Sequence, residues 1–514
     1  MNLDYLPQAG LQLPANVPAQ QVVVNAAQWS HSALRLRDHG AVLLSLWGAD
    51  DRDRDGRFRV YAAFLLPQQV VVLEHSPTGG AAGYPSLTHW FPVADRLQRA
   101  LYDLLGMEAD IGDTRPWLRH DGWPEHGFPL RRDAAAAEPQ PQPGRPYPFV
   151  AVTGDGVHEI AVGPVHAGTI EPGHFRFSVV GEKVLRLETR FGYAHKGIAK
   201  RFEGQLLHDG HRLAARVSGD STVAYAWAYC AALESITATV VPPRAAALRA
   251  LALERERLAN HLGDLGALGN DAGLAFGLVQ FSSLKEQLLR LNRQVFGQRY
   301  LFDWVLPGGV ATDIDAPAVR ALLDEASMLE QRVAGLRAIY ENHAGVQDRF
   351  RDTGVLSAAL AKAHGALGLV ARAAGVARDL RVDMPWPPYE QLRPRLVLAA
   401  GGDVAARARL RFDDIVESLR LCRALLETLP PGPSLASVPA AAPYRLGLGL
   451  VEGWRGPVMI ALETAPDDRV RRCHAHDPSW QNWPLIEYAI IGNIVPDFPL
   501  INKSFNLAYS GIDG

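Results

Sequence analysis

The chain has 514 residues, 48% of them hydrophobic and 21% charged, with Lys+Arg 52 against Asp+Glu 55 and a formal net charge of −3. This composition excludes global disorder, and the charge argues against binding nucleic acid through bulk positive charge. Cys230, Cys422 and Cys473 are too few and too scattered for a disulfide framework or a four-thiolate metal site, so we expect a reducing compartment. The first residues show no basic segment followed by an apolar one, so no signal peptide is predicted.

Residues 1–132 predict a small N-terminal α+β domain. Phe58–Pro67 and Gln68–Glu74 are typical of strands, and Ala94–Leu105 is typical of an amphipathic helix. The apolar face of this helix consists of Leu97, Leu101, Leu104 and Leu105, and Gly106 follows at the C-terminal cap position. Residues 133–148 then hold five prolines and a glycine, which predicts an extended linker.

Residues 149–514 predict a large, mainly helical bundle domain with β-rich ends, which makes the whole chain α+β. Alternation on both sides of Gly181-Glu182, from Phe175 to Leu187, predicts a β-hairpin. The stretch from Ala199 to Leu429 is mostly helical in pattern. Near the end we expect strands at Tyr444–Val451 and Gly456–Glu463, and a helical run at Trp483–Ile491 that stops at Gly492.

The most apolar segment, Val223–Val241, is the nearest candidate for a membrane span. It contains Glu234 and several hydroxyl residues, and Pro242-Pro243 stop it. A spanning helix needs about 20 predominantly apolar residues with few or no charges. We therefore favour a buried helix in a large bundle, so that any contact with a membrane runs through partner subunits.

The sequence contains none of the standard catalytic or ligand-binding motifs. The Walker phosphate-binding loop and the H-E-x-x-H, Cys-x-x-Cys and G-x-S-x-G patterns are all absent from it. His474 and His476 beside Asp477 are a weak metal candidate, and a surface loop is the favoured interpretation. Asn260, His261 and Asp264 interrupt an apolar helix, either as satisfied structural groups or as part of a functional site.

A family resemblance emerges from several segments taken together. They occur in the order Gly163-Pro-Val-His-Ala-Gly-Thr-Ile-Glu-Pro-Gly-His-Phe, Phe191-Gly-Tyr-Ala-His-Lys-Gly, Leu253-Glu-Arg-Glu-Arg-Leu-Ala-Asn-His-Leu-Gly-Asp-Leu-Gly, Pro307-Gly-Gly-Val, Asp379-Leu-Arg, Asp477-Pro-Ser-Trp-Gln-Asn-Trp and Gly492-Asn-Ile-Val-Pro-Asp. This series resembles the large subunits of energy-converting nickel-iron hydrogenases and the related quinone-site subunit of respiratory complex I. The N-terminal domain, with Tyr84-Pro-Ser-Leu-Thr-His-Trp and Trp123-Pro-Glu-His-Gly-Phe-Pro, is similar to the small companion subunit of complex I.

The resemblance also implies where metal ligands would stand, and this chain departs from it there. In the hydrogenases two Cys-x-x-Cys motifs hold nickel and iron through four thiolates, because such a site requires soft ligands. Ser218 and Ser221 occupy the first pair of positions, and Ala508 and Gly511 occupy the second. We therefore expect no metal ligands, no nickel-iron centre and no hydrogenase activity from this chain alone.

Complex I binds a quinone in the equivalent cavity, and this chain departs there as well. The resemblance places the quinone-binding tyrosine of complex I at Gly219 of this chain. It places the quinone-contacting histidine near Ile170 or Glu171. The resemblance implies a retained cavity with other lining groups, which are His166, Glu171, His174, Asp220 and Tyr225. These, with His195, are the candidates for proton relay or ligand binding, and a hydrogen-bonded structural core is the alternative. We assign His166, Glu171, His195 and Asp220 as catalytic candidates and Tyr225 as a cofactor-binding one.

Lys196 and Arg216 match basic positions that face an iron–sulfur cluster held by a neighbouring subunit in the relatives. A nearby cation stabilises the reduced cluster by Coulomb attraction and raises its potential. We expect both residues to act at the edge of such a cluster, and ordinary exposed basic residues are the alternative.

The resulting expectation is a peripheral-arm subunit of a complex of the NADH:quinone oxidoreductase and hydrogenase-related type. It would pass electrons from a neighbour's iron–sulfur cluster to a quinone or another small acceptor, coupled to ion translocation. The expected partners are an iron–sulfur subunit, membrane ion-translocating subunits and a quinone, at the cytoplasmic side of the inner (plasma) membrane, and no nucleic acid. A non-catalytic scaffold that couples a redox neighbour to the membrane arm is the alternative.

Overall fold

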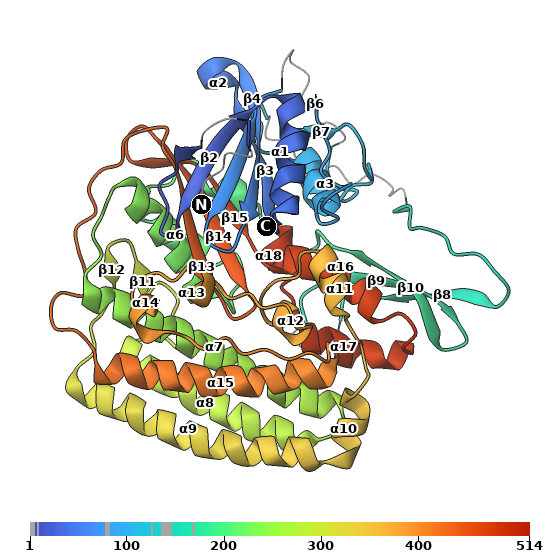
Figure 1. Cartoon of the computed structure of the whole chain (residues 1–514), viewed down its shortest axis with the longest axis vertical. Coiled ribbons are helices and arrows are strands. Elements are labelled where there is room, and N and C mark those ends of the chain that lie inside the picture. Colours follow the sequence, from blue (N-terminus) through green and yellow to red (C-terminus); the bar gives the residue numbers. More distant parts are fainter. Residues whose placement is uncertain (1–5, 8–9, 78–82, 125–126, 135–145, 167–169) are drawn as a thin grey trace.

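The computed structural model describes residues 6–7, 10–77, 83–124, 127–134, 146–166 and 170–514. It combines a small sheet-and-helix unit, a projecting three-stranded sheet, a bundle of long helices and a C-terminal sheet (Figure 1). Most of the predicted linker at 133–148 lies outside the described residues.

The N-terminal unit is a five-stranded sheet in the order β1-β2-β5-β4-β3. Its strands are β1 (Leu11–Gln12), β2 (Ala19–Val24), β3 (Val42–Asp51), β4 (Arg57–Leu65) and β5 (Val70–His75). Within this sheet the β2–β5 pair is parallel and the other pairs are antiparallel. β4 and β5 confirm the two predicted strands. The other elements are α1 (Ala26–Asp38), α2 (Arg52–Asp55), α3 (Ala94–Leu105) and the short pair β6 (Gly83–Tyr84) and β7 (Glu108–Ala109).

Helix α3 confirms the predicted helix in both its bounds and its cap. Gly106 adopts φ 67°, the left-handed conformation that favours glycine after a helix, and its N–H bonds to the Tyr102 carbonyl. The leucine face packs toward β3, and Leu97, Leu101 and Leu105 are buried.

The three-stranded sheet β8 (Val157–Val162), β9 (His174–Val180) and β10 (Lys183–Arg190) projects from the body of the molecule (Figure 1). β9 and β10 form the predicted hairpin, with Phe175 opposite Thr189. β8 adds an edge strand that the sequence pattern did not predict, because it has no apolar alternation.

Long helices form the lower part of the molecule in Figure 1: α7 (Pro243–Asp271), α8 (Ala275–Phe296), α9 (Ala316–Asn342) and α15 (Val404–Glu427). Shorter elements join or flank them: α4 (Ile198–Phe202), α5 (Gly210–Ala214), β11 (Val305–Leu306), β12 (Gly309–Val310), α10 (Ala344–Phe350), α11 (Ala358–Ala363), α12 (Gly368–Ala373), α13 (Leu380–Asp383) and α14 (Tyr389–Leu392). The predicted helical region is thereby confirmed, and it includes the small β11–β12 hairpin at Pro307-Gly308-Gly309.

The candidate membrane segment is the buried helix α6 (Thr222–Ile236), as favoured. It packs against the C-terminal sheet of β13 (Leu446–Glu452), β14 (Pro457–Ala465) and β15 (Arg469–His476). A Cβ built on Gly449 would lie 1.8 Å from the Ala228 carbonyl oxygen, so only glycine allows this close approach. None of the helices among the described residues combines the length and apolarity needed to cross a membrane.

The chain ends in α16 (Ser479–Ala489), a 3₁₀ turn (Val495–Asp497), α17 (Phe498–Phe505) and α18 (Ser510–Asp513). α16 begins and ends earlier than the predicted helical run. The strand β15 was not predicted, because its alternation is carried by arginines and histidines. His476 is fully buried and bonds to Gln481, so the prediction of a surface loop at His474 and His476 is wrong.

The N-terminal unit is held against the C-terminal sheet by hydrogen bonds that span more than 400 residues of sequence. The Asn16 amide bonds both backbone groups of Leu450, at 2.8 and 2.9 Å. Ser45 Oγ lies 2.8 Å from His474 Nε2, and the Gln481 amide donates to the Leu43 and Leu44 carbonyls. β3 and β15 therefore lie side by side.

Candidate functional site

Two loops carry the positions where the resemblance places metal ligands. The first, Ser218–Ser221, precedes α6, and the second, Ala508–Gly511, leads into α18. Ser218, Ser221 and Ala508 are buried. The sequence places the two loops 290 residues apart (218 to 508), and the fold connects them through side chains from β13–β14 and β15–α16.

Arg455, in the turn between β13 and β14, joins the first loop to the chain entering the second. Its guanidinium donates to both Asp220 carboxylate oxygens at 2.7 and 2.6 Å and to Ser221 Oγ at 3.3 Å. Its Nε donates to the Asn506 carbonyl at 2.6 Å. The same guanidinium lies over the Trp454 ring, 3.9 Å from the centroid.

Asp477 occupies the space beside the second loop. A Cβ built on Gly511 would lie 2.7 Å from Asp477 Oδ2 and 2.9 Å from the Ala508 Cβ. The same Oδ2 accepts a hydrogen bond of 2.7 Å from the buried Tyr225 hydroxyl. Burial and the Asp477 charge raise the pKa of Tyr225 well above its usual value, so Tyr225 is a neutral donor here.

Asp220 also reaches a cavity behind the first loop. Burial raises the pKa of Asp220, but the Arg455 charge and the Ser218 hydroxyl at 2.9 Å more than offset this, so the pKa is lowered and Asp220 is a carboxylate. Its side chain is 41% exposed, toward a cavity of about 240 Å³. That cavity is also lined by Gly219, Glu256, Asn260, Lys285, Tyr300 and Phe302.

Burial shifts the pKa values of two groups on the wall of this cavity, Glu256 and Lys285. Burial raises the pKa of Glu256 to about 8, although its carboxylate accepts N–H bonds from Val223 and Ala224 at the start of α6. Burial lowers the pKa of Lys285, and nearby Asp264 and Asp220 partly restore it. A polar ligand in this cavity would meet Asp220, Glu256 and Lys285 together.

The opening hairpin contributes Glu171 to the second loop. The Glu171 carboxylate accepts the backbone N–H groups of Tyr509 and Ser510 at 3.3 and 3.1 Å. His166 and His174 instead bond to carbonyls of their own hairpin, Gly173 at 2.8 Å and Gly163 at 3.2 Å. Glu171, Asp220 and Tyr225 therefore border the two loops, whereas the hydrogen bonds of the two histidines are within the hairpin.

His195 and Lys196 lie at the far side of the second loop, near Asp513. His195 Nδ1 is 2.6 Å from the Asp513 carbonyl, and burial lowers the pKa of His195. Burial raises the pKa of the Asp513 carboxyl to about 7, even though it accepts N–H bonds from Ala194 and Gly192. Lys196 is exposed as a residue, but its ammonium turns inward and donates to the Arg216 and Val217 carbonyls at 2.8 and 2.7 Å. Burial of the ammonium lowers the pKa of Lys196.

Arg216 is on the surface and is paired. It forms a two-point ion pair with Asp303, at 2.6 and 2.8 Å, in which both side chains are more than a third exposed. Lys196 and Arg216 are thus linked through the Arg216 carbonyl and lie at the same edge of the first loop. That Lys196 and Arg216 lie near an iron–sulfur cluster of a neighbouring subunit stays a prediction.

The residues at the four ligand positions do not fit a nickel-iron centre. They offer two hydroxyls, a methyl group and no side chain, where four soft thiolates are needed. The three cysteines are buried in α6, α15 and β15. Within the described ranges no group of three or more His, Cys, Asp or Glu side chains is placed to hold a metal ion.

Arg455 and Asp477 are the functional candidates that sequence reasoning missed. Asp477 stands in the segment Asp477-Pro-Ser-Trp-Gln-Asn-Trp, which carried the resemblance, and it was named only beside His474 and His476 as a weak metal candidate. Arg455 stands in Gly453-Trp-Arg-Gly456, between two apolar strands. A charged residue at the turn between two buried strands was the available signal.

Comparison with known proteins places these features in a family. Residues 22–140 match the family model "Respiratory-chain NADH dehydrogenase, 30 Kd subunit", and residues 271–447 match "Respiratory-chain NADH dehydrogenase, 49 Kd subunit". Hydrogenase-4 component G of Escherichia coli (strain K12) is 30% identical over 92% of this chain and 84% of its own length. Formate hydrogenlyase subunit 5 of the same organism is 29% identical over 92% of this chain and 85% of its own length.

Two further similarities extend this result. The carbon monoxide-induced hydrogenase of Rhodospirillum rubrum is 32% identical over 68% of this chain and 97% of its own length. A chain of the membrane-bound sulfane sulfur reductase, an archaeal respiratory membrane complex, shares the fold with a TM-score of 0.66 at 24% identity, over 70% of this chain and 98% of that chain. The chain therefore belongs to the family of hydrogenase large subunits and complex I 49 kDa subunits, and it carries a fused domain of the 30 kDa type.

Proposed function

We propose that this chain is the peripheral-arm subunit of a membrane-associated oxidoreductase and works without a nickel-iron centre. It accepts electrons from an iron–sulfur cluster of a neighbouring subunit and delivers them to a quinone or another small acceptor. Proton uptake at the site is coupled to ion translocation by membrane subunits. The chain sits at the cytoplasmic face of the inner membrane, held there by those partners.

The replacement of metal ligands by a connected polar site carries this proposal. Where four thiolates would stand, Arg455 bridges Asp220 and the Asn506 carbonyl, and Asp477 fills the space of a side chain at position 511. The family relationship supports the redox context, because the matching family models are those of respiratory-chain NADH dehydrogenase subunits and the relatives include hydrogenase components.

The cavity beside Asp220 supports an acceptor site. At about 240 Å³ it can admit part of a ring-bearing or small polar molecule, and Gly219 contributes no side chain to its wall. Reduction of a quinone or similar acceptor consumes protons. Glu256, with a pKa near 8, is a carboxylic acid at neutral pH and can donate one there.

A second set of groups is suited to moving protons between the second loop and the hairpin. Asp513, with a pKa near 7, changes its charge at neutral pH, and its carbonyl contacts the His195 imidazole. Glu171 lies on the other side of the same loop, bonded to Tyr509 and Ser510. We propose these three residues as the local proton-handling groups.

The scaffold alternative is favoured by one observation. Arg455 and Asp477 fill the space between the loops with fully paired polar groups, as a structural core would. Under this alternative, the chain couples its redox neighbour to the membrane arm without exchanging electrons itself.

Substitution in the assembled complex separates the two functions. Asp220→Asn and Glu171→Gln keep the shape of the side chain and remove its charge, and each replaces one acceptor oxygen with an NH2 group. The test is the rate at which a pre-reduced neighbouring cluster is reoxidised by added quinone, followed by electron paramagnetic resonance. Electron transfer through this chain predicts a rate at least about tenfold slower for Asp220→Asn.

Asp313→Asn is the matched control, because Asp313 pairs with Arg244 on the surface, outside both loops. It should leave the rate unchanged. Unchanged rates in Asp220→Asn and Glu171→Gln, with the complex intact, would establish the scaffold function instead.

A further inference from the structure

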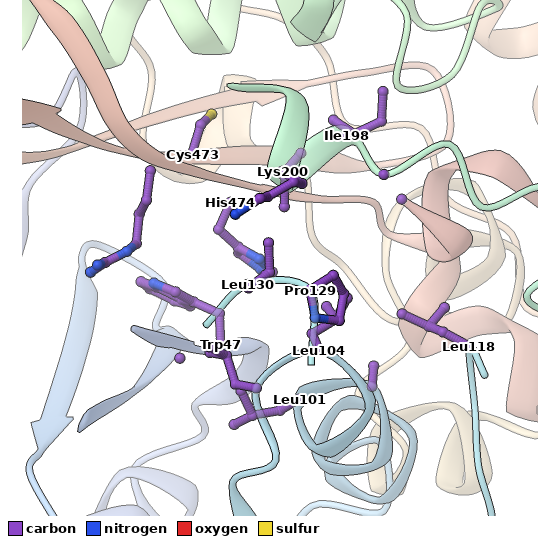
Figure 2. A pocket seen from close by; sticks show the side chains of 18 of the residues that line it. Trp47, Leu101, Leu104, Leu118, Pro129, Leu130, Ile198, Lys200, Cys473 and His474 are labelled. Atoms are coloured by element: carbon purple, nitrogen blue, oxygen red, sulfur yellow. The ribbon is translucent and has the colours of Figure 1, made fainter. Parts of the chain in front are cut away.

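A second cavity, of about 130 Å³, lies between the N-terminal unit and the large domain. Figure 2 shows Trp47, Leu101 and Leu104 of the N-terminal unit extending toward Ile198, Lys200, Cys473 and His474 of the large domain. This cavity is separate from the cavity beside Asp220, and the two have no lining residue in common.

The walls of this cavity are predominantly apolar. α3 contributes the leucine face of Leu97, Leu101, Leu104 and Leu105, and the surrounding segments add Leu118, Pro129, Leu130, Ile198 and Trp480. An amphipathic helix normally buries such a face against protein, but here part of it faces open space. An unfilled apolar cavity costs stability in proportion to its volume.

The charged residues on the walls are already satisfied by protein partners. Lys200 bonds to Glu203 at 2.9 Å, and Arg472 bonds to Asp51 at 2.7 Å and Glu463 at 2.8 Å. Asp50 is held by Arg52, and Asp513 accepts two backbone N–H groups. A charged ligand therefore gains little from entering, because these groups already have partners and the rest of the wall is apolar.

One wall is aromatic and neutral. Trp47 and His474 line the cavity, with their rings stacked 5.1 Å apart at an interplanar angle of 10°, and Tyr61, which is outside the lining, stacks on Trp47 at 5.2 Å and 17°. His474 Nε2 is held by Ser45 Oγ at 2.8 Å, and burial lowers the pKa of His474 to about 3, so the imidazole is uncharged at neutral pH. A ligand ring can pack against this stack in an offset or edge-on arrangement.

We propose that this cavity is a binding site for a neutral molecule built on a single six-membered aromatic ring. An engineered apolar cavity of about 150 Å³ binds benzene, so the volume here suits one ring and excludes a fused pair. The bound ring contacts the leucine face of α3 on one side and the segment Gly511–Gly514 on the other. Occupancy would therefore link the N-terminal unit to the loop that borders the candidate site. This site does not depend on the electron-transfer proposal.

Calorimetric titration of the 514-residue chain with toluene tests the proposal, with benzoate as the charged analogue of the same size. We expect saturable binding of one toluene per chain, with benzoate binding at least about tenfold more weakly. Absence of saturable toluene binding, or equal binding of benzoate, would overturn the proposal.

Two substitutions locate the binding. Ala100→Phe fills the cavity from α3 and should weaken toluene binding at least about tenfold. Leu104→Ala enlarges it and should shift the preference from toluene toward naphthalene by a similar factor. Leu323→Ala is the matched control, since Leu323 is a partly buried helical leucine of α9 that does not line this cavity, and it should leave the preference unchanged.

The outcome is decided even if Ala100→Phe fails to fold, because the Leu104→Ala preference can be measured alone. Toluene binding that survives in folded Ala100→Phe, or an unchanged naphthalene preference in Leu104→Ala, would place the ring elsewhere and contradict the proposal.

Discussion

The Arg455 guanidinium holds the Asp220 carboxylate through two hydrogen bonds, 2.7 and 2.6 Å long, in the space between the two loops. The two residues come from a β-turn and from the loop that precedes α6, 235 residues apart in the sequence. A planar guanidinium matches a carboxylate at two points and leaves Nε free for the Asn506 carbonyl. The pair joins the first loop to the chain entering the second, next to the positions where the resemblance places metal ligands.

Removal of the Arg455 charge should destabilise the chain more than removal of an equally well-formed surface pair. Arg455→Met leaves Asp220 without its cation and the Asn506 carbonyl without its donor. We expect the free energy of unfolding to fall by about 2–4 kcal/mol in urea titrations.

Arg216→Met is the control, since Arg216 makes the same two-point contact with Asp303 at an exposed position. Exposed pairs contribute about 0–1 kcal/mol. Equal losses in the two variants would show that the Arg455–Asp220 pair has no special structural role.

The second loop should not tolerate a side chain at position 511. A Cβ there would lie 2.7 Å from Asp477 Oδ2, so Gly511→Ala must displace a buried carboxylate or the loop. We expect a destabilisation of about 1–3 kcal/mol, measured by thermal unfolding. Gly335→Ala in α9 is the control, because nothing lies within 4 Å of its added Cβ and alanine favours a helix by about 1 kcal/mol. A neutral or stabilising Gly511→Ala would contradict the packing described here.

The Tyr225 hydroxyl should stabilise the Asp477 carboxylate measurably. Tyr225→Phe removes the 2.7 Å hydrogen bond and leaves a buried carboxylate oxygen without that donor. The expected loss is about 1–3 kcal/mol in urea unfolding. Tyr488→Phe, at a ring that is 48% exposed, should cost less than about 0.5 kcal/mol. A loss as small as that of Tyr488→Phe would mean that Asp477 does not depend on Tyr225.

The Asp513 carboxyl should make stability fall as pH rises from about 4 to about 7. Its pKa is raised to about 7 in the fold, from about 3.8, so the protonated form is the one the fold favours. That contribution is complete below about pH 4, and it is lost as pH rises through about 7. Asp513→Asn removes the titration.

Subtracting the free energy of unfolding of the Asp513→Asn variant from that of the wild type isolates the contribution of Asp513 from those of all other titrating groups. The stability difference, measured by urea unfolding at each pH, should decline by at most about 4 kcal/mol between pH 4 and 8. A difference that stays flat or increases with pH would show that the Asp513 carboxyl is ionised throughout this range.

The elements that the sequence predicted well are those with strong local patterns. α3 agrees in both bounds and in its Gly106 cap, because its leucine spacing and its capping glycine are local signals. α6 was favoured as a buried helix because Glu234 interrupts its apolar run, and Glu234 indeed pairs with Arg249 inside the protein.

The elements that were missed depend on distant partners. β15 is a strand because β14 pairs with it and because β3 lies beside it, and its histidines are buried by Trp47 and Gln481. Alternation of apolar and polar residues predicts a strand poorly where arginines occupy buried positions. Arg471 and Arg472 are charged, yet both are mostly buried because they form ion pairs. The surface-loop prediction failed for that reason.

The sequence named residues of the two loops but could not show how side chains connect the loops. Family resemblance indicated Ser218, Ser221, Ala508 and Gly511, and the pattern of polar residues indicated Asp220. The role of Arg455 follows only from the three-dimensional arrangement, because a turn arginine has no local signal that points to a carboxylate 235 residues away. The space beside Gly511 is likewise a tertiary property.

The central claim is that electrons pass through this chain without nickel, and nickel dependence tests it directly. The assembled complex is purified from cells grown with and without nickel, its nickel content is measured by mass spectrometry, and reoxidation of the pre-reduced neighbouring cluster by quinone is followed. We predict no stoichiometric nickel in either preparation and the same reoxidation rate in both. A rate that falls on nickel depletion and returns when nickel is restored, with about one nickel per chain, would contradict the account.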